Sequence, residues 1–137
     1  MFYEIAIKVN RMQENGKEKE VVERYIADAE TFTEAEAKGV KEYADYQLKG
    51  DVVAIKRSNV YEIVNENNGE YDKLFKAKIV SIFVDEKTEK EKEQPYHVLI
   101  WATDMDDANR KVQEYMKQGL SDMRWVLTKE TNLIDVI

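Results

Sequence analysis

Six residues of this chain have types and spacing suited to a phosphorylated, base-containing ligand: Lys76, Lys78, His97, Trp101, Arg124 and Trp125. Strand alternation places the two lysines on one face with the histidine and the first tryptophan, and the last two residues fall on a strand expected nearby. Cationic side chains would bind phosphate groups, and an indole would stack on a base. In the alternative interpretation, which describes the commoner role of such lysines, their stems only cover apolar surface.

The sequence offers little for catalysis. His97 is the only histidine, and it could act as a general base or a metal ligand, although a hydrogen-bonded spectator is the commoner role. The chain has no cysteine, and its serines Ser58, Ser81 and Ser121 lie in no Gly-x-Ser-x-Gly motif. We therefore predict no catalytic residues. An enzyme would need the fold to bring His97 close to a carboxylate.

The densest acidic cluster, Asp104, Asp106 and Asp107, could in principle hold a divalent cation. The EF-hand pattern fails, because its final bidentate glutamate would fall at Tyr115. Carboxylates at this spacing also suit the start of a helix, where they accept backbone N–H groups and face the positive end of the dipole. We expect Asp106 to cap a helix here, and we predict neither a metal nor a cofactor.

Composition narrows the class of partner. The chain has 137 residues, of which 43% are hydrophobic and 36% charged, and its net charge is −7. That negative charge disfavours electrostatic binding over a broad surface to duplex nucleic acid or to an anionic membrane. No apolar stretch approaches the ~20 residues of a membrane-spanning helix, and the first residues lack signal-peptide character. We expect a cytoplasmic protein, in a bacterial or an infected cell.

An internal repeat organises the chain. The segment SNVYEIV at 58–64 returns as TNLIDVI at 131–137, an offset of 73 residues, and each position keeps its chemical class. The same offset relates FTEA at 32–35 to MDDA at 105–108. A constant offset of about half the chain predicts one domain made of two repeats, 1–64 and 74–137, joined by a linker at 65–73.

Each repeat reads as strand, strand, helix, strand. Residues 2–9 alternate as a half-buried strand, Asn15-Gly16 suits a hairpin turn, and Thr33 with Glu36 suits a capping box at a helix start. The third strand continues through a bulge at Ser58-Asn59. A right-handed crossover favours the strand order 2-1-3.

Two such units predict an α+β fold: one antiparallel sheet of about six strands with both helices on one face. The third strands are expected to meet at an internal pseudo-twofold. Two half-sheets packed face to face are the competing arrangement. In the second repeat the face away from the helix is apolar, with Val80, Ile82, Val84, Leu99 and Trp101. Such a face packs on the other half, on a second subunit or around a ligand.

Four segments resemble a known family: MFYEI at 1–5, FTEAEA at 32–37, FKAK at 75–78 and IDVI at 134–137. They are similar to a family of short uncharacterised proteins from Bacteroides-type gut bacteria and their phages. The resemblance spans essentially the whole chain and brings no catalytic residues. It implies a phage or prophage setting, in which small acidic proteins often inhibit host defence or sequester its signals.

We therefore expect a small non-enzymatic binding protein of phage or prophage origin, forming a homo-oligomer. Its most specific version is an anti-defence protein that sequesters a nucleotide immune signal or blocks a host protein. Its expected partner is a phosphorylated small molecule or a host protein, with no duplex nucleic acid and no membrane. The alternative is a structural or accessory phage protein that acts only through protein–protein contacts.

Overall fold

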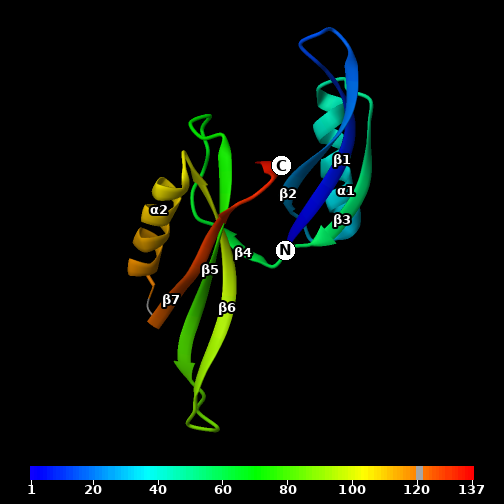
Figure 1. Cartoon of the computed structure of the whole chain (residues 1–137). Coiled ribbons are helices and arrows are strands. Elements are labelled where there is room, and N and C mark those ends of the chain that lie inside the picture. The colour runs from blue at the N-terminus through cyan, green and yellow to red at the C-terminus, as the bar shows by residue number, and fades with distance from the viewer. Residues whose placement is uncertain (120–121) are drawn as a thin grey trace. The chain divides into compact units, whose positions relative to one another are not determined.

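A computed structural model describes residues 1–119 and 122–137 of the chain (Figure 1). Contacts divide it into two compact units: unit 1, Met1–Ser58 with Asn132–Ile137, and unit 2, Asn59–Thr131. The described residues form two helices and eight strands, in the order β1 (Phe2–Met12), β2 (Glu18–Asp28), α1 (Phe32–Asp45), β3 (Gly50–Arg57), β4 (Val60–Ile63), β5 (Lys73–Val84), β6 (Glu91–Ala102), α2 (Met105–Lys117), β7 (Asp122–Glu130) and β8 (Leu133–Val136). Neither helix in the described part is long and apolar enough to cross a membrane.

Unit 1 is a four-stranded sheet in the order β3-β1-β2-β8, with α1 packed against β1, β2 and β3. The pairs β1–β2 and β1–β3 are antiparallel, whereas β8 runs parallel to β2. Alternate residues of β1 face the helix, which is why its apolar positions enter the core. This core comprises Tyr3, Ile5, Ile7, Val9, Tyr25, Ala27, Ala29 and Ala35.

Unit 2 has the corresponding arrangement. Its sheet order is β4-β6-β5-β7, with β5–β6 and β5–β7 antiparallel and β4 parallel to β6. The helix α2 packs against β5, β6 and β7. The core comprises Phe75, Ala77, Ile79, Val98, Ile100, Ala102, Ala108 and Val112.

The predicted α+β class and the strand order 2-1-3 are confirmed, since β2-β1-β3 and β6-β5-β7 are both found. The prediction of one antiparallel sheet with about six strands and both helices on one face is wrong, because there are two four-stranded mixed sheets with one helix each. The expected bulge at Ser58-Asn59 is instead a change of sheet. The short strands β4 and β8 therefore belong to different sheets, and each completes the sheet built mainly by the other half of the sequence.

The unit boundaries follow from this change of sheet. The chain passes between units after Ser58 and after Thr131, whereas the linker expected at 65–73 lies inside unit 2. The single-domain interpretation with repeats 1–64 and 74–137 stays a prediction.

Helix α1 begins two residues earlier than the expected capping box. Thr31, not Thr33, is the N-cap, and its hydroxyl accepts a hydrogen bond from the Glu34 backbone N–H at 3.1 Å. The Glu34 carboxylate in turn accepts the Glu30 N–H at 3.2 Å. A cap side chain and an acid three residues on thus satisfy backbone donors at the helix start, as a capping box does.

Beyond the end of β4, a side chain continues the parallel pairing with β6. The Val64 N–H donates to the Leu99 carbonyl at 2.8 Å. The Asn65 amide then binds the backbone of Trp101, accepting from its N–H and donating to its carbonyl, both at 2.8 Å. The asparagine side chain takes the place of one further peptide group on this edge.

We predict that Asn65→Ala lowers the free energy of unfolding by about 1–3 kcal/mol, because the Trp101 N–H loses its partner in a partly buried site. Urea unfolding followed by circular dichroism measures this. Asn68→Ala is the matched control, since Asn68 is exposed and such surface changes stay within about 0.5 kcal/mol. Equal losses in both variants would show that the Asn65 bridge contributes nothing of its own.

Candidate functional site

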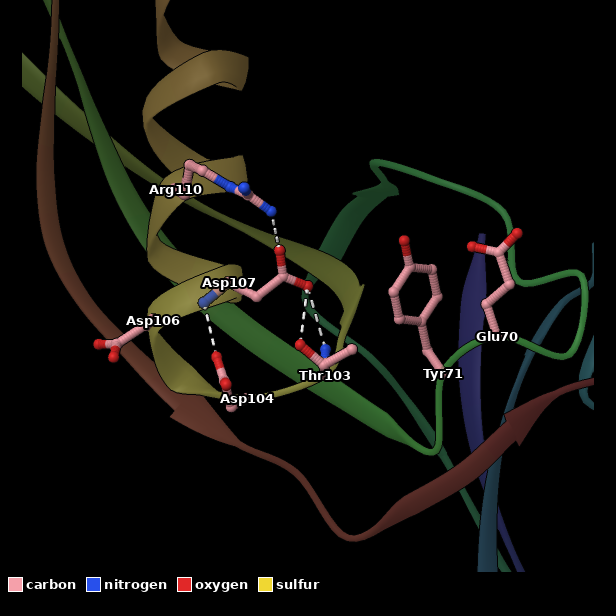
Figure 2. A pocket seen from close by; sticks show the side chains of 7 residues that line it. All are labelled: Glu70, Tyr71, Thr103, Asp104, Asp106, Asp107 and Arg110. Carbon is pink, nitrogen blue, oxygen red and sulfur yellow. Dashed lines mark hydrogen bonds and ion pairs between the residues drawn. The ribbon is translucent and has the colours of Figure 1, made fainter.

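A pocket of about 590 Å³ lies at the start of α2 (Figure 2). Its centre is Asp107, which accepts the Thr103 N–H at 3.1 Å and its hydroxyl at 3.3 Å. The Arg110 guanidinium donates to the other Asp107 oxygen. Figure 2 shows Tyr71 and Glu70 on the segment that faces these groups. The pocket is lined by Glu70, Tyr71, Thr103, Asp104, Asp106, Asp107 and Arg110.

The central carboxylate is already satisfied by the protein. The Thr103 backbone N–H, then the Lys111 ammonium at 3.0 Å and the Arg110 guanidinium, lower the pKa of Asp107 to about 2. Lys111 also lies 3.9 Å from the centre of the Tyr71 ring, within cation–π distance. These polar side chains therefore bind one another and stabilise the start of the helix.

The acidic cluster does cap the helix α2, but with a different aspartate from the one expected. Asp104, not Asp106, is the N-cap, and its carboxylate accepts the Asp107 N–H at 2.8 Å. Asp106 points away from the other labelled side chains (Figure 2). Among the described residues, no group of three acidic or histidine side chains has an arrangement that could hold a metal ion.

Unit 1 has a smaller pocket, of about 240 Å³, in which carboxylates from three elements meet. Arg11 donates two hydrogen bonds to Glu23, at 2.7 and 3.0 Å. Burial, and then the charge of Asp135 on β8, raise the pKa of Glu42 on α1. Burial together with the nearby acids also raises the pKa of Tyr25 to about 12. The charged form of Glu42 is therefore unfavourable in this pocket. For the same reason the pocket is poorly suited to binding an anion.

Four cationic or titratable side chains come together on the sheet face of unit 2 that lies opposite α2. We call Lys76, Lys78, His97 and Lys129 the basic cluster. Lys76 and Lys78 are alternate residues of β5 and share one face. Lys76 lies directly opposite Lys129 on β7, and Lys78 directly opposite His97 on β6.

The proximity of these groups has an electrostatic consequence. Burial, and then the charges of the three lysines, lower the pKa of His97. The Lys76 ammonium donates to the Asn59 side-chain oxygen at 2.6 Å. Lys78 and Lys129 form no ion pair with any residue that the structure describes. Like charges directly opposite each other on a sheet are destabilising, so the cross-strand pair of Lys76 and Lys129 has a cost that a nearby anion would reduce.

The structure brings together only some of the residues predicted from sequence. Lys76, Lys78 and His97 do lie side by side. Arg124 is on the same face, but it lies opposite Val80 and pairs with Glu93 at 3.2 Å.

The two tryptophans offer no open ring face beside the cluster. Trp101 is buried, with 3% of its surface exposed. Trp125 lies opposite Ile79 on the helix side of the sheet, where its ring N–H donates to Thr128 at 2.9 Å. Ligand binding by the six predicted residues stays a prediction.

Sequence reasoning missed Lys129. Alternation from Arg124 would have placed Lys129 on the helix side, because the two residues are an odd number of positions apart. The register shift between Trp125 and Leu127 returns Lys129 to the outer face, opposite Lys76. The expected apolar outer face also proves divided: Val80, Leu99 and Trp101 are buried, whereas Val84 is exposed. Ser121, considered as a nucleophile, lies outside the described residues.

Fold and site together define an α+β protein with two sheet-and-helix units and a cationic cluster on one sheet. The chain belongs to the family described as a domain of unknown function, DUF4494, whose model matches residues 1–137. The predicted resemblance to an uncharacterised family is thereby confirmed. Searches find no match among curated proteins or solved structures.

For the pocket of unit 1, we predict that Glu42→Gln stabilises the protein at neutral pH. Because the folded state raises the pKa of Glu42, its protonated form favours folding. In the wild type, the contribution of Glu42 to the free energy of unfolding is fully present at low pH and is lost as the pH rises through the raised pKa. The gain from Glu42→Gln should therefore shrink on acidification. Urea unfolding at several pH values measures this gain, and Glu36→Gln, at an exposed position of the same helix, is the matched control.

For the basic cluster, we predict that Lys78→Gln raises the pKa of His97, because removing a neighbouring positive charge favours the imidazolium form. His97 is the only histidine, so a pH titration followed by NMR reports on one imidazole. The control Lys87→Gln, on an exposed turn, should leave the pKa unchanged. An unchanged pKa in Lys78→Gln would contradict the electrostatic coupling.

Proposed function

We propose that this protein is a non-enzymatic binding protein that holds a phosphorylated small molecule at the basic cluster. The observation that carries the proposal is the convergence of Lys76, Lys78, Lys129 and His97 on one sheet face of a chain whose net charge is −7. The like charges of Lys76 and Lys129 lie directly opposite each other on the sheet, which has a cost in stability. An anion would offset that cost.

Phosphate fits the chemistry of the cluster. Lysine ammonium groups bind phosphate oxygens through short, charge-assisted hydrogen bonds. A histidine with a lowered pKa stays neutral at pH 7, so it can also accept a hydrogen bond from a ligand. Leu127 lies directly opposite Lys78 and is half exposed, so it offers apolar contact for the rest of the ligand. With Trp101 buried, this contact replaces the expected stacking.

In its most specific form, the ligand is a nucleotide immune signal and the protein is a cytoplasmic anti-defence protein of phage or prophage origin, which sequesters the signal. This step rests on the family resemblance and on the phosphate chemistry of the cluster. Blocking a host protein is the other form of the same role. A structural or accessory phage protein is the alternative, favoured by the exposed apolar residues Val126 and Leu127 on β7.

We also infer that the two halves of the chain derive from one duplicated strand-strand-helix-strand unit. Support comes from structural details at the offset of 73 residues. The N-caps Thr31 and Asp104 are related by it. So are Val53 and Val126, the extra residues at register shifts in the edge strands β3 and β7.

The binding proposal is tested with tripolyphosphate and with a panel of linear and cyclic nucleotides, by calorimetry and by NMR of His97. We expect binding that weakens with salt and raises the pKa of His97, because an anion favours the imidazolium form. Lys78→Gln and Lys129→Gln should each weaken binding about tenfold, which corresponds to about 1.4 kcal/mol.

Lys87→Gln is the control for general loss of charge and should bind as the wild type does. Equal weakening in Lys87→Gln would assign the effect to net charge alone. No binding of any phosphate compound at millimolar concentration would overturn the proposal and favour the protein–protein alternative.

A further inference from the structure

Strand β3 forms an outer edge of the unit 1 sheet and has a neighbour on one side only, β1, among the strands that the structure describes. Its eight residues read GDVVAIKR, without proline and with an apolar centre. Val53 at this centre is 51% exposed. Open edges of this kind present unpaired N–H and C=O groups to any strand that can lie alongside.

The side chains of β3 are sorted between the two faces of the sheet. Asp51 lies opposite Lys8, and Lys56 lies opposite Glu4, with which it forms an ion pair at 3.1 Å. Both therefore occupy the face away from α1. Val52 and Ile55 lie opposite the core residues Ile7 and Ile5 and face the helix.

The irregularity in β3 makes this sorting possible. Ala54 pairs with Ala6 and Val52 with Ile7, so Val53 is an extra residue without a partner on β1. In a regular strand, positions 51 and 56 would point to opposite faces, because they are an odd number of residues apart. The inserted residue returns them to the same face.

We propose that β3 pairs antiparallel with β3 of a second copy of this chain, about a twofold axis between Val53 and Ala54. This register places Asp51 opposite Lys56 of the other copy, twice by symmetry. It also places Val52 opposite Ile55 on the helix face. These two kinds of opposed pair each share a face and match in charge or in apolar character, and backbone hydrogen bonds join the two sheets.

The corresponding edge of unit 2 shows why the pairing is specific to β3. Strand β7 has its extra residue at Val126, with Arg124 and Lys129 at the positions that match Asp51 and Lys56. The same symmetric register would oppose Arg124 to Lys129 of the other copy, a like-charge pair that is destabilising. Of these two matching edges, β3 alone is self-complementary, so its pairing closes as a dimer.

Charge exchange between two variants tests the register. Asp51→Lys alone opposes lysine to lysine, and Lys56→Asp alone opposes aspartate to aspartate. Each variant should associate at least about tenfold more weakly than the wild type. An equimolar mixture opposes lysine to aspartate at both positions, so it should recover the dimer. Sedimentation equilibrium against the monomer mass of 16.1 kDa measures this.

Cysteine cross-linking gives an independent readout, since the chain contains no cysteine. Copies with Asp51→Cys and copies with Lys56→Cys should form a disulfide when mixed, because directly opposed residues lie about 5 Å apart. Either variant alone should not, because like positions would be about 16 Å apart at 3.3 Å per residue.

Arg124→Asp on β7 is the matched edge control and should leave the dimer intact. A wild-type protein that stays monomeric at millimolar concentration overturns the proposal. So does a dimer that persists unchanged in Asp51→Lys, or a mixture of the two charge variants that fails to associate.

Discussion

The fold depends on completing the backbone hydrogen bonding of β2 and β6. Each of these strands has an antiparallel partner on one side, and its other edge would be open without a further strand. The chain supplies that strand from the other half of its sequence, β8 for β2 and β4 for β6. Neither half can therefore build its whole sheet alone, although each contributes the central hairpin and helix of one unit.

The two added strands meet different surroundings. In unit 2 the hydroxyl of Tyr115 donates to Glu62 on β4, so this acid has a neutral partner from the helix. In unit 1 the corresponding pair is Glu42 and Asp135 on β8, two acids whose proximity contributes to the raised pKa of Glu42. The attachment of β8 thus carries an electrostatic cost that the attachment of β4 does not.

The outer sheet faces differ in the same way between the units. In unit 1 the lysines are neutralised within the sheet, Lys8 by Glu20 at 3.0 Å and Lys56 by Glu4. In unit 2 the matching face brings Lys76, Lys78 and Lys129 together beside His97. Farther along the same face, Arg124 pairs with Glu93 at 3.2 Å. Two sheets with corresponding strand orders therefore carry different charges on their outer faces.

The sequence by itself determined what depends on local period. Strand alternation placed Lys76, Lys78 and His97 on one face and gave the α+β class. Three features needed the tertiary structure: the change of sheet at Ser58-Asn59, the position of Lys129 opposite Lys76, and the burial of Trp101. The physical reason is that alternation is a property of consecutive residues, whereas register and strand exchange depend on backbone groups far apart in the chain finding each other.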